Sequence, residues 1–174
     1  MPRLLADSLR RRFRFHAWAS GALADALLEA SCTPGGQPLP EALDRARGVL
    51  AHTLVADRVW LMRLRGERTD ALALWPTLDA RGLRLLAQRN ADAYEDLLEP
   101  LADDDLARVA AYRALDGTRH RSAVHDVLEH VLLHGAHHRG QAAAALRAAG
   151  VAPPRLDYIA WVRARDAPPD DLTG

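Results

Sequence analysis

Five of the eight histidines in this 174-residue chain fall within residues 124–150, which read VHDVLEHVLLHGAHHRGQAAAALRAAG. His134 and His138 are four residues apart, a spacing that places two side chains one turn apart on the same face of a helix. Imidazole nitrogens ligate divalent metals such as zinc, nickel, iron(II) or manganese. The pair therefore indicates either two ligands of a metal site or two histidines satisfied by hydrogen bonds inside a helical bundle.

The residues around the pair argue against two well-known metal chemistries. Zincin proteases carry HExxH, in which the glutamate is the general base, whereas this chain has HGAHH with Gly135 at that position. A di-iron carboxylate centre needs glutamates from two helices and two Glu-x-x-His motifs, and only Asp126 and Glu129 near His130 suggest such a pattern. A mononuclear site remains, with a third ligand from elsewhere and coordination positions open for water or substrate.

The helix that carries the pair is predicted by its apolar periodicity. At about 100° per residue, one stripe collects Val124, Val127, Leu128, Val131, Ala142, Ala145, Leu146 and Ala149. On this projection His138 falls near the middle of the stripe, His134 lies roughly 40° from it, and His130 sits at its edge. Gly150 and the following Pro153-Pro154 end the helix.

The helix over residues 124–150 must pack against other long helices, which fix its position. Helical spacing of apolar residues predicts helices over residues 2–30, 41–65 and 78–99, and a short fifth helix over 156–165 that docks on the bundle. Asp116-Gly117 predicts a small hairpin or an ordered loop before the last long helix. We therefore predict one all-α domain over residues 1–174, a four-helix bundle of the up-down-down-up type with a long crossover.

Composition limits the function. The net charge of 0 and the pI near 7.1 give no basic field that would draw the protein onto nucleic acid. All 23 basic residues are arginines, which excludes Schiff-base lysine chemistry. The single cysteine, Cys32, forms no internal disulfide and is a weak candidate for a catalytic thiol. No apolar run approaches the ~20 residues of a membrane span, so we expect a soluble cytoplasmic protein.

Three other features have two interpretations each. His52 shares a helix side with apolar residues and, from this pattern alone, is more simply an ordinary half-buried histidine than a ligand. Trp75, in a loop, is either a pocket lid or a packed anchor, and we favour the anchor. The arginines of RRRFR, residues 10–14, form either a solvated face, which we favour, or an anion contact.

Four segments, in order along nearly the whole chain, resemble the DinB/YfiT-like family. The most specific is HVLLHGAHHRGQ, followed by a glycine, a Pro-Pro pair and a Tyr-containing segment, which is similar to the family's last long helix and tail. LAHTLVADRVWLMRLRGE resembles its second helix, YRALDGTRHRSAVHDVLEH the entry to the last one, and FRFHAWASGALADALL its first. One departure is His16, which stands where many relatives have Tyr or Asn and alters the expected polarity of the pocket.

The resemblance implies a four-helix bundle, usually a homodimer, with one divalent metal bound by three histidines. Carried over position by position, these ligands are His52, His134 and His138. His130 does not match a ligand position but is a candidate partner for a ligand's second nitrogen. Arg139 and Gln141 belong to the family's helix motif, and we expect them to support the structure or the ligands.

Characterised relatives include S-transferases and isomerases that use low-molecular-weight thiols such as bacillithiol, mycothiol or glutathione. The resemblance thus implies a metal-dependent thiol S-transferase acting on small electrophiles. The alternative is a non-catalytic metal-binding protein with a stress-response or sensor role. Neither interpretation needs a nucleic-acid or membrane partner.

Overall fold

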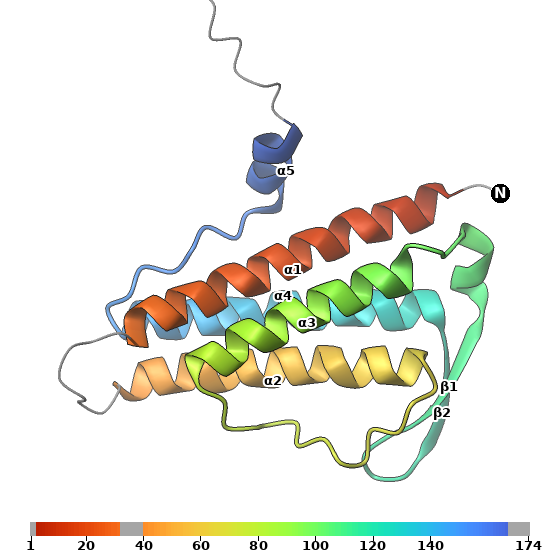
Figure 1. Ribbon diagram of the computed structural model, residues 1–174, viewed down its shortest axis with the longest axis horizontal. Coiled ribbons are helices and arrows are strands. Elements are labelled where there is room, and N and C mark those ends of the chain that lie inside the picture. The colour runs from red at the N-terminus through yellow and green to blue at the C-terminus, as the bar shows by residue number, and fades with distance from the viewer. Residues whose placement is uncertain (1–2, 32–39, 167–174) are drawn as a thin grey trace, which may run out of the picture.

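The computed structural model describes residues 3–31 and 40–166, which form four long helices, a hairpin and a short last helix (Figure 1). The helices are α1 (Leu4–Ser31), α2 (Glu41–Leu64), α3 (Ala80–Leu98), α4 (Val124–Ala148) and α5 (Tyr158–Asp166). Every predicted helix is confirmed, with ends within two residues of the expected ones. Cys32 and the tail after residue 166 lie outside the described residues.

The topology is the predicted up-down-down-up bundle. In Figure 1, α1 and α4 run in one direction and α2 and α3 in the other, so residues 65–79 form a crossover that returns along α2. α1 packs mainly against α3, and α2 mainly against α4. The crossover ends at Asp79, whose side chain accepts a hydrogen bond of 2.7 Å from the Gly82 N–H and caps α3.

The predicted hairpin is also confirmed. Strand β1 (Val109–Arg113) pairs antiparallel with β2 (Arg119–Ala123), and Gly117 takes a positive φ of 86° in the turn between them. A five-residue 3-10 helix, Asp103–Ala107, precedes β1. β2 leads directly into α4, and the Val124 N–H donates to the carbonyl oxygen of Arg108 at 2.8 Å, so the hairpin fixes the start of the histidine-bearing helix.

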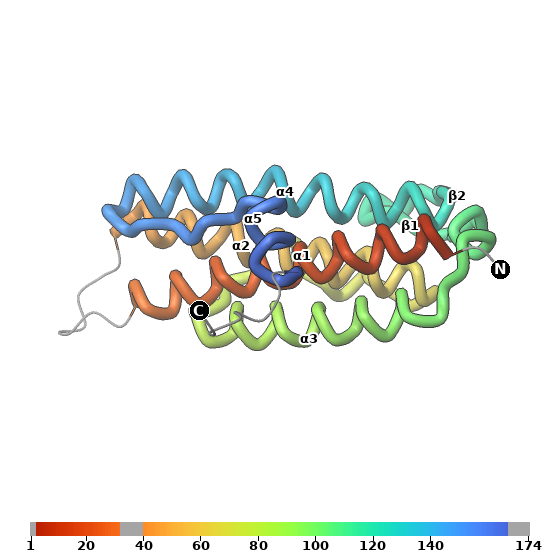
Figure 2. The backbone as a smooth tube through the Cα atoms, turned by 90° about the horizontal axis from the view of Figure 1, so that it is seen from above, coloured from red at the N-terminus to blue at the C-terminus, as the bar shows by residue number. Residues whose placement is uncertain are grey.

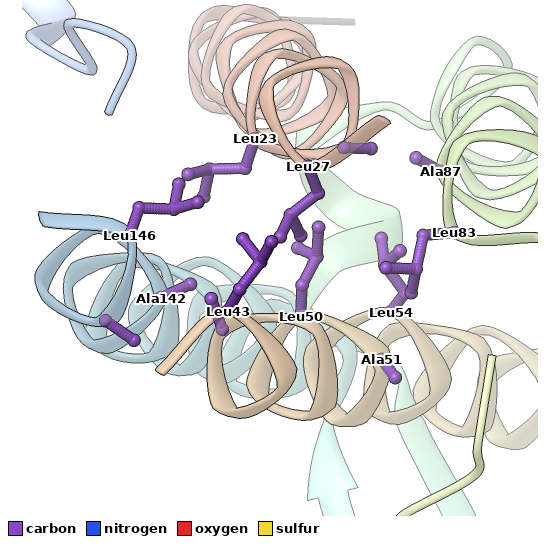
Figure 3. Close-up of a cluster of buried hydrophobic side chains, with 13 residues drawn as sticks. Leu23, Leu27, Leu43, Leu50, Ala51, Leu54, Leu83, Ala87, Ala142 and Leu146 are labelled. Atoms are coloured by element: carbon purple, nitrogen blue, oxygen red, sulfur yellow. The ribbon is translucent and has the colours of Figure 1, made fainter. Parts of the chain in front are cut away.

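The bundle core has two apolar clusters with a polar layer between them. One cluster, drawn in Figure 3, includes Leu23, Leu54, Ala87 and Ala142, and the other includes Phe13, Leu61, Tyr94 and Val131. Between these positions each helix contributes buried polar side chains: His16 and Ser20 from α1, Asp57 from α2, Asn90 from α3 and Arg139 from α4. This polar layer, formed by these five residues, lies at the level of the histidine pair of α4.

Two of the α1 arginines contact the bundle, so the prediction of a simple solvated face is wrong for them. Arg10 donates to the carbonyl oxygens of Leu98 (2.9 Å) and Leu101 (2.5 Å), which ties α1 to the end of α3. Arg12 forms a bidentate pair with Glu129 of α4 at 2.9 and 2.6 Å. These contacts occupy the guanidinium groups of Arg10 and Arg12, so these two side chains are not free to bind an anion.

The last helix docks on the bundle through aromatic side chains. Phe15 of α1 lies edge-on to Tyr158 and Trp161, with ring centroids 5.1 and 5.7 Å apart. Figure 1 shows α5 on the side of α1 that faces away from α2, and in the view of Figure 2 α5 overlaps α1. Among the described helices, none is long and apolar enough to cross a bilayer.

Candidate metal centre

Three histidines from two helices meet between α2 and α4. His52 comes from α2, and His134 and His138 come from α4, with one candidate ligand atom of each lying within 4.8 Å of the others. The centroid of the His52 ring is 5.3 Å from that of His134 and 4.8 Å from that of His138. Nitrogens that share one ion at about 2.1 Å lie at most about 4.2 Å apart, so a small side-chain adjustment would bring all three within reach of it.

The crossover holds His52 by two contacts. The Nδ1–H group of His52 donates to the carbonyl oxygen of Leu74 at 3.0 Å, because a carbonyl can only accept. Trp75 stacks on the imidazole, with centroids 4.0 Å apart and an interplanar angle of 11°. Since Nδ1 carries the proton, Nε2 of His52 has a free lone pair for a metal. Trp75 is 63% exposed and covers one face of His52, so the structure favours the interpretation as a pocket lid over that as a packed anchor.

Gln141 orients His138 in a comparable way. The His138 Nδ1–H group donates to Oε1 of Gln141 at 2.8 Å, and Nε2 of Gln141 donates to Nε2 of His137 at 3.0 Å. Nε2 of His138 is therefore the nitrogen with a free lone pair. The motif residue Gln141 supports a candidate ligand, as expected, and His137 contacts both this amide and the edge of the His138 ring.

Among the candidate ligands, His134 has the most strongly lowered pKa. Burial, and next the neighbouring His138, lower its pKa from 6.5 to about 4. Burial also lowers the pKa of His138. Both rings are neutral at pH 7, which is the form that binds a metal. His134 Nδ1 is buried and has no hydrogen-bond partner among the described residues, a costly state that an additional partner would relieve.

These residues fit a divalent ion. Neutral imidazoles suit zinc, nickel, iron(II) and manganese, and three of them leave positions open. Within the described part of the chain, no further His, Cys, Asp or Glu joins this cluster. The expected set of His52, His134 and His138 is thus brought together by the fold, and His52 is the member that its own sequence pattern did not single out.

The position of the pair on α4 differs from the helical projection. The buried stripe runs through Val131, Gly135, Arg139 and Ala142, whereas His134 and His138 are only partly buried at its edge, toward α2. The prediction that His138 lies near the middle of the stripe is therefore wrong. A position at the edge keeps the imidazoles accessible, which a site for exchangeable ligands requires.

His130 lies near the cluster without supporting it. Its ring is 5.6 Å from that of His134, but it is exposed and forms an edge contact of 5.0 Å with Trp60. Because His134 Nδ1 has no partner in the described residues, the predicted hydrogen bond between the two histidines is not present. Although the residue is exposed overall, partial desolvation of its ring, followed by the charge of Arg63, lowers the pKa of His130.

An open groove runs along α2 and α4 beside the histidines, and it is lined by two of their neighbours but by none of the three themselves. Its volume is about 750 Å³, and Trp75 and Gln141, which contact His52 and His138, line one part of it. Small residues of both helices line much of the rest, and Glu41 and Arg45 supply its charged groups. A small organic molecule fits a space of this size.

Behind the histidines, the polar layer contains a chain of hydrogen bonds. Arg139 donates from Nη1 to Nδ1 of His16 at 2.8 Å, so His16 Nε2 carries the proton and donates to Oδ2 of Asp57 at 2.8 Å. All three residues are at most 5% exposed. His16 therefore belongs to the interior and does not line the metal centre. Burial lowers the pKa of Arg139 to about 10, which leaves it charged at neutral pH.

Gly135 makes room for this chain. A Cβ atom at this position would lie 2.3 Å from Cε1 and 2.8 Å from Nδ1 of His16, and 2.9 Å from Nη1 of Arg139. Apolar periodicity alone does not reveal this connection, but one signal points to it: the helical stripe of positions 124, 128, 131, 135, 139, 142 and 146 runs through a glycine and an arginine. An arginine at such a position requires a buried partner.

Comparison with known proteins agrees with this architecture. The model of the family described as "DinB family" matches residues 9–170. A curated protein, "Protein DinB" of Bacillus subtilis (strain 168), is 24% identical over 164 residues, which cover 88% of this chain and 93% of that protein. No solved structure gives a significant match.

Proposed function

The chain belongs to the DinB family, and on that premise we propose that it is a divalent-metal-dependent transferase that joins a low-molecular-weight thiol to a small electrophile. The observation that carries the proposal is the cluster of His52, His134 and His138 at the edge of an open groove. A purely structural site is closed by four protein ligands, whereas a site with three leaves room for a substrate.

The chemistry requires a thiolate at neutral pH. A divalent ion held by the three imidazoles would lower the pKa of a bound thiol and so supply the thiolate. The transfer forms a bond between sulfur and an electrophilic carbon, the thiol proton passes to solvent, and the leaving group departs with its electron pair. Because the metal activates the thiol, no strong protein base is needed.

The chain's own residues would hold and orient the substrates. Leu74 and Gln141 fix the orientation of His52 and His138, as described above. Trp75 covers His52 and shields that side of the centre from water. Arg45, exposed on α2 in the groove, is placed to pair with a carboxylate of the thiol. A homodimer is part of the proposal and is checked by light scattering.

The test is an activity assay on metal-loaded protein purified without an affinity tag. The protein is loaded in turn with zinc, nickel, iron(II) or manganese and mixed with a bromoalkyl or chloronitrobenzene electrophile and with bacillithiol, mycothiol or glutathione. We expect metal-dependent consumption of one thiol, abolished in the His52→Ala variant. A protein that binds metal but consumes none of the thiols would contradict the proposal and favour the sensor interpretation.

A matched pair of arginine variants tests the groove. Arg45→Gln should raise the KM for the thiol with little change in kcat, because the residue binds a distant carboxylate. Arg47→Gln is the control, since Arg47 is on the same helix but pairs with Asp44 and does not line the groove. Equal kinetic effects of the two variants would show that Arg45 has no specific role.

A further inference from the structure

The polar layer contains three buried oxygen atoms without partners. Ser20 Oγ, Asp57 Oδ1 and Asn90 Oδ1 have no hydrogen-bond partner among the described residues. These residues are only 2%, 2% and 4% exposed, so bulk solvent does not reach them. Each unpaired buried polar group costs free energy, and three of them on three different helices need a common explanation.

All three residues line the same small cavity. It lies between α1, α2 and α3, and its wall includes Phe13 and Tyr94. The space available to a water-sized sphere is about 10 Å³, which is near the lower limit for one water molecule. The other polar atoms of these side chains are already used, because Asp57 Oδ2 accepts from His16 and Asn90 Nδ2 donates to the Leu54 carbonyl at 2.7 Å.

The unsatisfied groups match one water molecule. Asp57 Oδ1 and Asn90 Oδ1 can only accept, and a water has two protons to donate. The Ser20 hydroxyl can donate to the oxygen of the same water. We propose that this cavity is a binding site for a single internal water, which bridges Ser20, Asp57 and Asn90 and completes the polar layer.

The charges favour a neutral ligand over a cation. The carboxylate of Asp57 is linked through neutral His16 to the guanidinium of Arg139, so the layer already contains one negative and one positive group. A cation in the cavity would add an unpaired charge to the interior, which is strongly unfavourable. An anion is disfavoured as well, because two of the three atoms are acceptors.

The water would link the helices that surround the metal centre. Direct hydrogen bonds join α1, α2 and α4 through His16, Asp57 and Arg139. The water adds α3 through Asn90 and fixes the second oxygen of Asp57. It would thereby help to hold Arg139, the residue next to His138, in place from a site that contacts neither metal nor substrate.

The first test is a crystal structure of the full-length wild-type protein at a resolution that shows ordered waters. We expect one density peak in the cavity, at hydrogen-bond distances of about 2.5–3.0 Å from the three oxygens. An empty cavity, a direct bond between Ser20 and Asn90, or a peak at about 2.3 Å, typical of a metal cation, would each overturn the proposal. This test depends on no variant.

The second test is a double-mutant cycle between residues that do not bond directly. Ser20→Ala and Asn90→Ala, alone and combined, are compared by urea unfolding. If one water bridges the two residues, the change in the unfolding equilibrium constant of the double variant should differ by about twofold or more from the product of the changes in the two single variants. Ser20→Ala with Thr53→Val is the control, because the Thr53 hydroxyl bonds to Val49 in its own helix and does not line the cavity. If the effects of Ser20→Ala and Asn90→Ala are as independent of each other as those of the control pair, no water bridges Ser20 and Asn90.

Discussion

Replacement of Gly135 by alanine tests the polar layer, because two opposing effects act at one position. Alanine is a better helix former than glycine, which favours the variant by about 0.8–1.0 kcal/mol. The added Cβ, however, would lie 2.3 Å from Cε1 of His16, well inside van der Waals contact. His16 is buried and bonded on both ring nitrogens, so it has no free direction in which to move.

The expected result is a net loss of stability. Displacing His16 or Arg139 breaks a hydrogen bond to a charged group, worth about 1.5–3 kcal/mol, and crowding a packed core costs about 1–3 kcal/mol. After the gain in helix propensity, Gly135→Ala should lower the free energy of unfolding by about 1.5–5 kcal/mol. Urea unfolding of metal-free protein, followed by circular dichroism, measures this difference.

The same helix provides a matched control. Gly140 is exposed, and no heavy atom lies within 4 Å of a Cβ built there. Gly140→Ala should therefore raise the free energy of unfolding by about 0.4–1 kcal/mol. If Gly135→Ala stabilises the protein as much as Gly140→Ala does, the contact between Gly135 and His16 is wrong, and with it the polar layer.

Three further predictions concern the histidine cluster. Wild-type protein should bind one divalent ion per chain, and the His137→Ala variant should retain it, whereas the His52→Ala variant should bind none. Elemental analysis after dialysis measures the bound metal. Metal retained by His52→Ala would refute the three-histidine site. In metal-free protein, the free energy of unfolding should fall as the pH drops from 6.5 toward about 4, because the lowered pKa of His134 means that the unfolded chain binds a proton in this range and the folded chain does not. Urea unfolding at several pH values should show a weaker pH dependence for His134→Ala than for the wild type. Metal binding should change tryptophan fluorescence through the stack of Trp75 on His52, so the change should vanish in Trp75→Phe and persist in Trp161→Phe.

The sequence predicted the elements well because the signals are local. Apolar spacing locates each long helix, and Asp116-Gly117 locates the hairpin, since both depend on neighbouring residues. The pairing of His134 with His138 follows from helix geometry alone. The link to His52, more than eighty positions earlier, came only from the family resemblance, because residue spacing says nothing about which helices pack together.

The polar interior was harder to predict. The helical projection assigned His138 to the buried stripe and overlooked Gly135 and Arg139. These two residues directly follow His134 and His138 in the sequence, and both are buried. A pattern based on residue hydrophobicity places every arginine on the surface, including one that is buried. Only its partners, His16 on α1 and Asp57 on α2, make that position stable, and those partners come from distant parts of the chain.

The crossover must be long enough to return along α2. It returns along most of α2, which has 24 residues and is about 36 Å long, while residues 65–79 span at most about 50 Å when fully extended. A deletion would straighten the connection, and it would draw Trp75 away from His52 even if the packing of the helices stayed intact. The length of this connection, and not only its residues, thus decides whether an aromatic ring can reach the candidate ligand on α2.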